Sequence, residues 1–197
     1  MKKEFKVIAD LLPNKTRVLD VGCGDGALMS LLEKNKKIEV RGLEINNDNV
    51  QKCINKGLSV IQGNAETELH QFPNKSFDYV VLSQTLQAFY DPNQVIKELL
   101  RIGSSVIVSI PNFGYWKVRI NLLLFGKMPV TKTLPNTWYD TPNLHMCTIK
   151  DLFDFCDEKK INIKQVIGLN GDRTSFITKN NLEIKNLFSK LGIFLIG

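Results

Sequence analysis

The residues with the most chemical information form one glycine-rich run near the start of the chain, Asp20-Val21-Gly22-Cys23-Gly24-Asp25-Gly26. A short apolar stretch precedes this run and a helix-like sequence follows it, which predicts a strand, a tight turn and a helix. Glycine suits such a turn because it adopts positive φ and allows a ligand to approach the backbone closely. The free N–H groups at the start of the helix can then face a small polar ligand.

The spacing within this run favours one kind of ligand. Its glycines follow G-x-G-x-G rather than the G-x-G-x-x-G of dinucleotide-binding turns. Asp20 places a carboxylate at the end of the predicted strand, and a carboxylate suits a cation rather than a pyrophosphate. S-adenosylmethionine (SAM) carries an α-ammonium group and a sulfonium, so the run predicts a SAM site.

Polar residues also follow the next predicted strands. Glu44 ends the second strand, where a carboxylate can accept hydrogen bonds from both ribose hydroxyls of an adenosine. Asn64 and Ala65 follow the third strand, where an amide or a backbone group can meet the adenine edge. Ser83 and Gln84 follow the fourth strand, beside the place where a methyl group would be transferred. Alternatively, these residues only cap turns and helices.

Catalytic candidates are few. His145 lies in an apolar segment and could act as a general base, although a lone histidine in such a segment can equally be hydrogen-bonded structure. Gln84 is the second candidate. The aromatic side chains could form a substrate wall, an anchor to the core or a partner surface, and the sequence does not separate these roles; they are Trp116, Trp138 and Tyr139.

Several site classes are disfavoured because their residues are missing from the sequence. No Asn/Asp-Pro-Pro-Tyr/Phe follows the fourth predicted strand, which argues against adenine methylation in DNA. No acidic pair stands there to hold a guanidinium, and no Asp/Asn cluster suggests a magnesium site. None of the cysteines forms C-x-x-C and no histidine lies at zinc-ligand spacing, so we expect no metal.

The elements that must position these residues alternate between strands and helices over the first 110 residues. Such alternation predicts βαβ units, a mostly parallel doubly wound α/β sheet and helices on both faces, with the ligand beyond the strand ends. The expected strands are 17–21, 38–44, 58–61, 77–82, 105–110, 161–167 and 193–196. The expected helices are 1–12, 26–35, 46–56, 115–125 and 149–159, and a further helix that Asp91-Pro92 opens and that includes Leu100.

The pattern changes after Pro111, where residues 126–147 read as a long loop with three prolines and several apolar side chains. Such a loop is too apolar for disorder, so we expect residues 112–148 to form an insertion that folds over the ligand end of the sheet. No linker, repeat or low-complexity tract interrupts the chain, and residues 1–197 are therefore expected to form a single domain.

Bulk properties set further expectations. The chain has 197 residues and a net charge of +6. Its lysines are dispersed, which favours solvated faces over a nucleic-acid surface. No apolar stretch reaches the roughly 20 residues that span a bilayer, and no apolar segment follows the first lysines as in a secretory signal. The four cysteines are read as free thiols, so a cytoplasmic location without membrane contact is expected.

At this point the chain resembles a known group. Residues 18–26 followed by Gly42-Leu43-Glu44 are similar to class I SAM-dependent methyltransferases. Residues 82–87, Pro111-Asn112-Phe113-Gly114 and residues 134–151 resemble, more narrowly, the MetW family of methionine biosynthesis proteins. The resemblance implies a seven-stranded sheet whose last strand is antiparallel, and a cytoplasmic partner, the MetX-type homoserine O-acyltransferase.

The resemblance also implies a bound SAM or S-adenosylhomocysteine (SAH). The contacts that it implies are Asp20, Gly22, Gly24, Glu44, Asn64 and Ala65. We expect Cys23, Ile45 and Ser83 to complete the cofactor site. Where many relatives of the wider group carry aspartate after the third strand, this chain has Asn64, which still donates and accepts hydrogen bonds. No methyl acceptor follows from the resemblance.

Three functions remain open at this level. The chain could be a SAM-binding accessory protein that activates or regulates the acyltransferase, in which case SAM would report the state of its own pathway. It could be a methyltransferase for an unidentified small molecule, since methyl transfer needs alignment and desolvation more than a strong base. Nucleic-acid methylation is suggested only by the positive charge.

Overall fold

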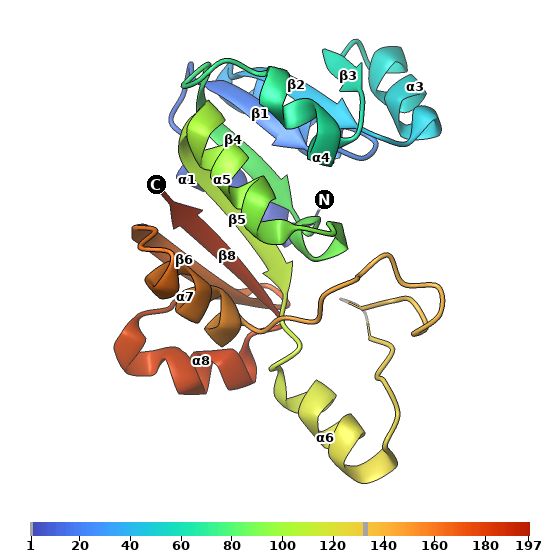
Figure 1. The fold of residues 1–197 in the computed structure, drawn as a ribbon, viewed down its shortest axis with the longest axis vertical. Coiled ribbons are helices and arrows are strands. Elements are labelled where there is room, and N and C mark those ends of the chain that lie inside the picture. Colours follow the sequence, from blue (N-terminus) through green and yellow to red (C-terminus); the bar gives the residue numbers. More distant parts are fainter. Residues whose placement is uncertain (1, 132–133) are drawn as a thin grey trace.

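The computed structural model describes residues 2–131 and 134–197. Within these ranges eight strands form one sheet in the order β3-β2-β1-β4-β5-β8-β6-β7 (Figure 1). Their bounds are β1 (Arg17–Val21), β2 (Glu39–Glu44), β3 (Val60–Gln62), β4 (Phe77–Ser83), β5 (Gly103–Pro111), β6 (Ile163–Asn170), β7 (Arg173–Phe176) and β8 (Leu191–Ile196).

The strand directions confirm the predicted mixed sheet. Strands β3, β2, β1, β4 and β5 pair in parallel, and the last strand, β8, is antiparallel to both β5 and β6. The structure adds one strand to the seven expected. Strand β7 forms a hairpin with β6 through Gly171 and Asp172, and Gly171 takes a φ of 62° in this turn. Its side chains are mostly exposed, so it lacks the apolar alternation that marks a strand.

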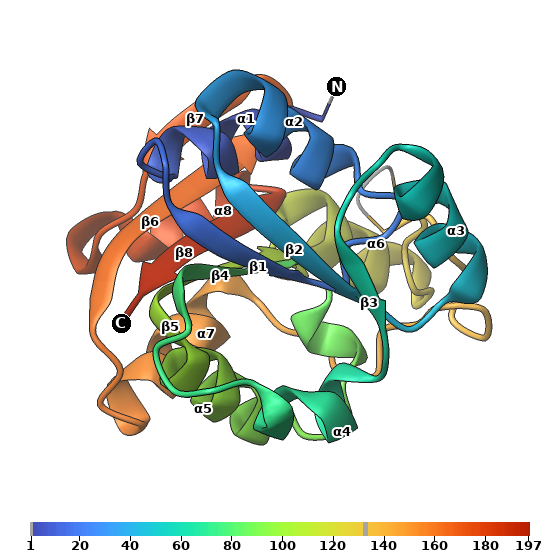
Figure 2. The same ribbon diagram turned by 90° about the horizontal axis from the view of Figure 1, so that it is seen from above.

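Helices cover both faces of this sheet (Figure 2). One face carries α1 (Lys3–Leu11), α2 (Ala27–Lys36) and α3 (Asn47–Asn55), and the other carries α4 (Ala65–Glu68), α5 (Pro92–Ile102) and α7 (Ile149–Glu158). Each set of helices buries a separate apolar core against the sheet. Helix α8 (Leu182–Phe188) lies beside α7 and β6. The sequence did not predict α4 or α8, which are both short.

Local sequence fixes where several of these helices begin. The side chains of Asn46 and Asp91 accept hydrogen bonds from the first turns of α3 and α5, and Pro92 occupies the first turn of α5. Thr148 and Asp151 form a capping box at the start of α7. These caps explain why the predicted helix starts lie within a few residues of the observed ones.

The end of β5 is held by Asn112, whose side chain is 2% exposed. Its Nδ2 donates to the carbonyl oxygens of Asn186 (2.6 Å) and Ser189 (2.7 Å), and its Oδ1 accepts from the N–H groups of Gly114 (2.9 Å) and Ile149 (3.2 Å). One amide therefore joins the chain after β5, the start of α7 and the turn between α8 and β8. This contact explains the polar residue in the middle of Pro111-Asn112-Phe113-Gly114.

Helix α6 (Trp116–Phe125) projects beyond the end of β5, away from the sheet (Figure 1). Only Val118 of the helix is buried, and it packs with Tyr115 and Leu134. Large apolar side chains of the helix are exposed: Leu123 is 83% and Leu124 67% accessible. Among the described residues no helix has the length and apolar character needed to cross a bilayer.

Candidate functional site

The glycine-rich run forms the turn between β1 and α2, as its sequence predicts. Gly22, Gly24 and Gly26 all have positive φ, between 56° and 74°. A Cβ on Gly26 would lie 2.4 Å from Cδ1 of Leu58 and 2.9 Å from Sγ of Cys53, so a side chain here would displace both neighbours and would also strain the backbone. The N–H of Gly22 donates to the carbonyl of Leu43 over 2.8 Å, which ties the turn to the neighbouring strand β2.

Glu44 braces this turn from the end of β2. Its side chain is 7% exposed, and its two carboxylate oxygens each accept a backbone N–H at 2.8 Å, Oε2 from Gly24 and Oε1 from Asn46. A carboxylate oxygen can accept two hydrogen bonds, so each retains capacity for a further donor such as a ribose hydroxyl. Gly24 thus acts through its backbone, by orienting Glu44.

A cavity of about 370 Å³ lies directly against the turn, and this volume suits a small ligand. Five of the predicted contacts line it: Gly22, Glu44, Ile45, Asn64 and Ala65. The other lining residues are Leu43, Gly63, Glu66, Thr85, Ala88, Phe89 and Tyr90. The structure therefore brings the ends of β1, β2 and β3 and the turn after β4 to one cavity.

Asp20 lies near the end of β1, two residues before Gly22, and is 1% exposed; it is not one of the residues that line the cavity. Among the described residues its Oδ1 has no hydrogen-bond partner. Burial, reinforced by the negative charges of Glu44 and Glu4, raises the pKa of Asp20 from 3.8 to about 7. A buried acceptor of this kind needs a donor, and a cationic ligand would supply one.

Cys23 is placed differently from its neighbours in the turn. Its side chain is buried, and a Cβ on Gly42 would lie 2.6 Å from its sulfur, so the thiol packs between the sheet and α2. Burial and the charge of Asp20 raise the pKa of this thiol well above its usual range. Cys23 can therefore offer the ligand only its backbone.

Asn64 and Ala65 stand at the start of α4. The Oδ1 of Asn64 accepts the N–H of Glu66 at 3.0 Å, as the alternative capping interpretation predicts, while the residue also lines the cavity. Glu66 in turn accepts the N–H groups of Tyr90 (2.8 Å) and Asp91 (3.1 Å). These bonds join the two walls of the cavity, one from the end of β3 and one from the turn after β4.

Ser83 and Gln84 do not line the cavity, and their side chains bond to Glu4 of helix α1. Ser83 Oγ donates to Glu4 Oε1 at 2.8 Å, Gln84 Nε2 donates to Glu4 Oε2, and Ser109 Oγ also donates to Glu4 Oε1. Gln84 adopts a φ of 52°, which few non-glycine residues do, and its N–H bonds to Ser109. The sequence placed Ser83 and Gln84 beside the ligand but did not identify their partner, Glu4.

His145 is exposed, and its backbone N–H donates to the carbonyl of Gln87 at 3.0 Å. Gln87 also donates from Nε2 to the carbonyl of Gln84. The two catalytic candidates, His145 and Gln84, are thus both bonded to Gln87 in η2 (Leu86–Ala88), and both bonds involve their backbone groups. Among the described residues no group of three or more histidine, cysteine or acidic side chains could hold a metal ion.

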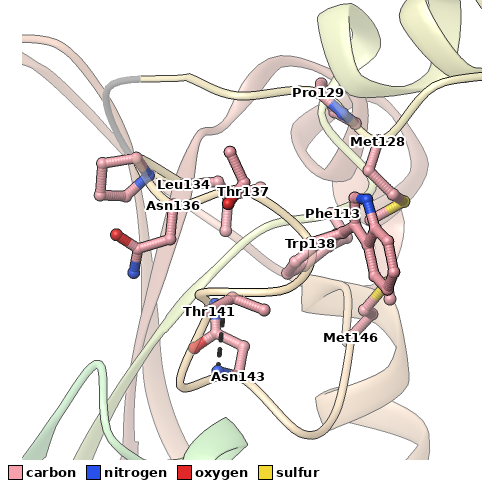
Figure 3. A pocket seen from close by; sticks show the side chains of 11 residues that line it. Phe113, Met128, Pro129, Leu134, Asn136, Thr137, Trp138, Thr141, Asn143 and Met146 are labelled. Atoms are coloured by element: carbon pink, nitrogen blue, oxygen red, sulfur yellow. Dashed lines mark hydrogen bonds between the residues drawn. The ribbon is translucent and has the colours of Figure 1, made fainter.

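A second, smaller cavity of about 100 Å³ lies in the segment after β5 (Figure 3). Its lining residues are Phe113, Met128, Pro129, Leu134, Pro135, Asn136, Thr137, Trp138, Thr141, Asn143 and Met146. Trp138 lies beside Met128, Phe113 and Met146, yet remains 75% exposed. Trp138 and Tyr139 also stack edge to face, 5.6 Å apart.

Sequence reasoning missed Glu4, Thr85, Glu66 and the aromatic pair Phe89 and Tyr90. A signal for Glu4 was present, because Glu4, Val7, Ile8 and Leu11 share one face of α1 at spacings of three, four and seven. A carboxylate on an otherwise apolar face needs buried partners. The partners lie about 80 and 105 positions away in the sequence, so no local pattern could name them.

Comparison with known proteins identifies the family of the chain. The family model described as "Methionine biosynthesis protein MetW" matches residues 2–196. The bifunctional methionine biosynthesis protein MetXA/MetW of Rhodopirellula baltica is 28% identical over 183 residues, which is 88% of this chain but 29% of that protein. Demethylmenaquinone methyltransferase of Listeria welshimeri is 32% identical over 130 residues, covering 58% of this chain and 54% of the relative.

The chain therefore spans about three-tenths of the first relative and about half of the second. A solved structure of an S-adenosylmethionine-dependent methyltransferase from Mesorhizobium loti is 15% identical, with a TM-score of 0.70, and the match covers 99% of this chain and 97% of that one. This likeness shows the class I methyltransferase fold. The match across almost every residue shows that the chain belongs to the MetW family of methionine biosynthesis proteins.

Proposed function

We propose that this chain binds SAM and acts in methionine biosynthesis by associating with, and activating or regulating, a MetX-type homoserine O-acyltransferase. The observation that carries the ligand is the pairing of two buried carboxylates around one glycine turn. Glu44 has acceptor capacity beside the cavity, and Asp20, two residues before Gly22, holds an oxygen that has no partner among the described residues. SAM carries ribose hydroxyls for the first and cationic groups for the second.

The partner is supported by the bifunctional relative from Rhodopirellula baltica, whose name joins MetXA and MetW in one protein. Fusing two proteins raises their effective concentration to the millimolar range for short flexible linkers, an arrangement that favours parts acting together. SAM is made from methionine, so a SAM site would report the output of the pathway. A coupling of about 1–3 kcal/mol between the SAM site and a partner surface is enough for useful control.

The test combines the chain with the MetX-type acyltransferase of the same organism. We expect a complex by size-exclusion chromatography and a change in the rate of homoserine acylation on adding the chain, modulated by SAM. Calorimetry with SAM on the chain alone tests the ligand separately. If the two proteins form no complex and the acylation rate does not change, the partnership is refuted. If calorimetry detects no heat of SAM binding, the SAM site is refuted.

A methyltransferase activity on a small molecule is the alternative. It is supported by the second cavity, whose aromatic and sulfur-containing lining could form a substrate wall. Incubation with methyl-labelled SAM and a small-molecule extract tests it, since transfer of label to any metabolite would favour this function. We also propose a cytoplasmic location, which the free thiols of Cys23, Cys53, Cys147 and Cys156 support.

A further inference from the structure

A third buried carboxylate, outside every predicted contact, belongs to the same end of the sheet. Glu4 comes from α1 and is 5% exposed. Its carboxylate accepts from Ser83 and Gln84, which follow β4, and from Ser109 on β5. Strand β1 lies between β2 and β4, so Glu44 and Glu4 approach Asp20 from opposite sides.

The three carboxylates have no positively charged partner in the part of the chain that the structure describes. None of the ion pairs among the described residues includes Glu4, Asp20 or Glu44. Buried charges in proteins are normally paired, because burying an uncompensated charge is costly. Serine hydroxyls and a glutamine amide satisfy Glu4 in part, but they carry no charge to offset its own.

The hydrogen bonds also leave acceptor capacity. Both sites on Glu4 Oε1 are filled by the two serine hydroxyls, whereas Oε2 accepts only from Gln84. Asp20 Oδ1 has no hydrogen-bond partner within residues 2–131 and 134–197, although Asp20 is almost fully buried. Asp20 faces the side of the sheet that carries α1, because Leu19 and Val21 on either side of it pack in the opposite core.

We propose that Glu4, whose charge adds to that of Asp20, is a specificity-determining residue that favours the cationic sulfonium-bearing end of the ligand through its electric field, so that the chain binds SAM in preference to SAH. This inference rests on the SAM site proposed above. SAM carries a sulfonium and an ammonium group against one carboxylate, for a net charge of +1. SAH has lost the sulfonium charge and is neutral overall, and 5′-methylthioadenosine lacks the amino-acid end entirely.

The test measures the affinities of SAM, SAH and 5′-methylthioadenosine by calorimetry for the wild type, Glu4→Gln and a control. Asp10→Asn is the matched control because it removes one negative charge from an exposed position on the same helix. For the wild type we expect SAM to bind about tenfold more tightly than SAH, about 1.4 kcal/mol. In Glu4→Gln that ratio should fall to about threefold or less, while the affinity for 5′-methylthioadenosine stays within twofold.

A double variant separates charge from structure. Glu4→Gln with Gln84→Glu exchanges the two side chains, which keeps an amide-to-carboxylate hydrogen bond and restores a negative charge at the same place. We expect it to recover the SAM-to-SAH ratio, and thermal unfolding checks that each variant is folded.

The results separate the two proposals. Equal binding of SAM and SAH by the wild type overturns the role of Glu4, and so does an unchanged ratio in a folded Glu4→Gln variant. If Glu4→Gln does not fold, the SAM-to-SAH affinity ratios of the wild type and of the double variant test the role of Glu4. Loss of the preference for SAM in a folded double variant overturns that role. Binding of none of the three compounds by the wild type refutes the SAM site itself.

Discussion

Replacement of Asp20 by asparagine tests the physical basis of the site directly. In the folded chain Asp20 is 1% exposed and lies near Glu4, Glu44 and the thiol of Cys23. None of the ion pairs among the described residues includes Asp20. Burial and the two neighbouring charges raise its pKa from 3.8 to about 7. At pH values between these two pKa values, Asp20 keeps a proton in the folded chain that it has lost in the unfolded chain.

The sign of the effect follows from this difference. The folded state binds more protons than the unfolded state between pH 3.8 and about 7, so the stability contributed by Asp20 falls as the pH rises through this window and is constant above it. One pKa unit corresponds to about 1.4 kcal/mol, so the whole loss is about 4 kcal/mol. Roughly 2–3 kcal/mol of it falls between pH 5 and 8.

The assay is guanidinium unfolding of the wild type and Asp20→Asn at several pH values from 5 to 8, under reducing conditions. Asparagine is neutral throughout, and the other titrating groups are common to both proteins. We expect the free energy of unfolding of Asp20→Asn, relative to the wild type, to increase by about 2–3 kcal/mol across this range. A difference that stays constant within about 0.5 kcal/mol would show that Asp20 is already ionised at pH 5 and would refute the reasoning.

Three more predictions concern the parts around the site. Asn112→Ala removes four hydrogen bonds to buried backbone groups and should lower the free energy of unfolding by about 3–4 kcal/mol, measured by urea unfolding. Asn121→Ala, which loses one exposed hydrogen bond in α6, should lower it by less than about 1 kcal/mol in the same assay. Gly26→Ala should destabilise by about 2 kcal/mol more than Gly57→Ala, because both positions have a φ of 74° but only Gly26 is crowded; equal midpoints would contradict this. Glu44→Gln should weaken SAM and 5′-methylthioadenosine alike, by about tenfold in calorimetry, because in the proposed site Glu44 binds the ribose that both compounds carry; the exposed Asp48→Asn is its control.

Much of the fold could be predicted because local signals agree with the tertiary structure. The run Arg17–Val21 is followed by glycines that only a turn accommodates, and its predicted bounds are those of β1. Helix α7 begins at Ile149 as predicted because Thr148 and Asp151 cap it. Strand β7 escaped prediction because it pairs at an exposed edge, where hydrogen bonding to β6 rather than apolar alternation defines it.

The site was predictable where it is local and unpredictable where it is not. Gly22, Glu44, Asn64 and Ala65 each follow a strand of the parallel sheet, and parallel strands bring such positions to one edge. Contacts across the sheet leave no comparable trace, so the bonds from Ser83 and Ser109 to Glu4 could not be read from spacing. Gln84 follows β4 as predicted, but the direction of its side chain depends on a backbone φ of 52°, which cannot be predicted for a glutamine from the sequence.

The placement of α1 has a practical consequence for assay design. Glu4 lies two residues after Lys2, so an affinity tag or a fluorophore joined at that end would sit next to the buried carboxylates. The other end of the chain is far better suited to attachment. Strand β8 runs antiparallel to β5, and Gly197 therefore lies beside Ser104 near the start of β5. The glycine turn lies at the other end of the parallel strands. A biosensor that immobilises the protein through Gly197 would leave the ligand entrance unobstructed.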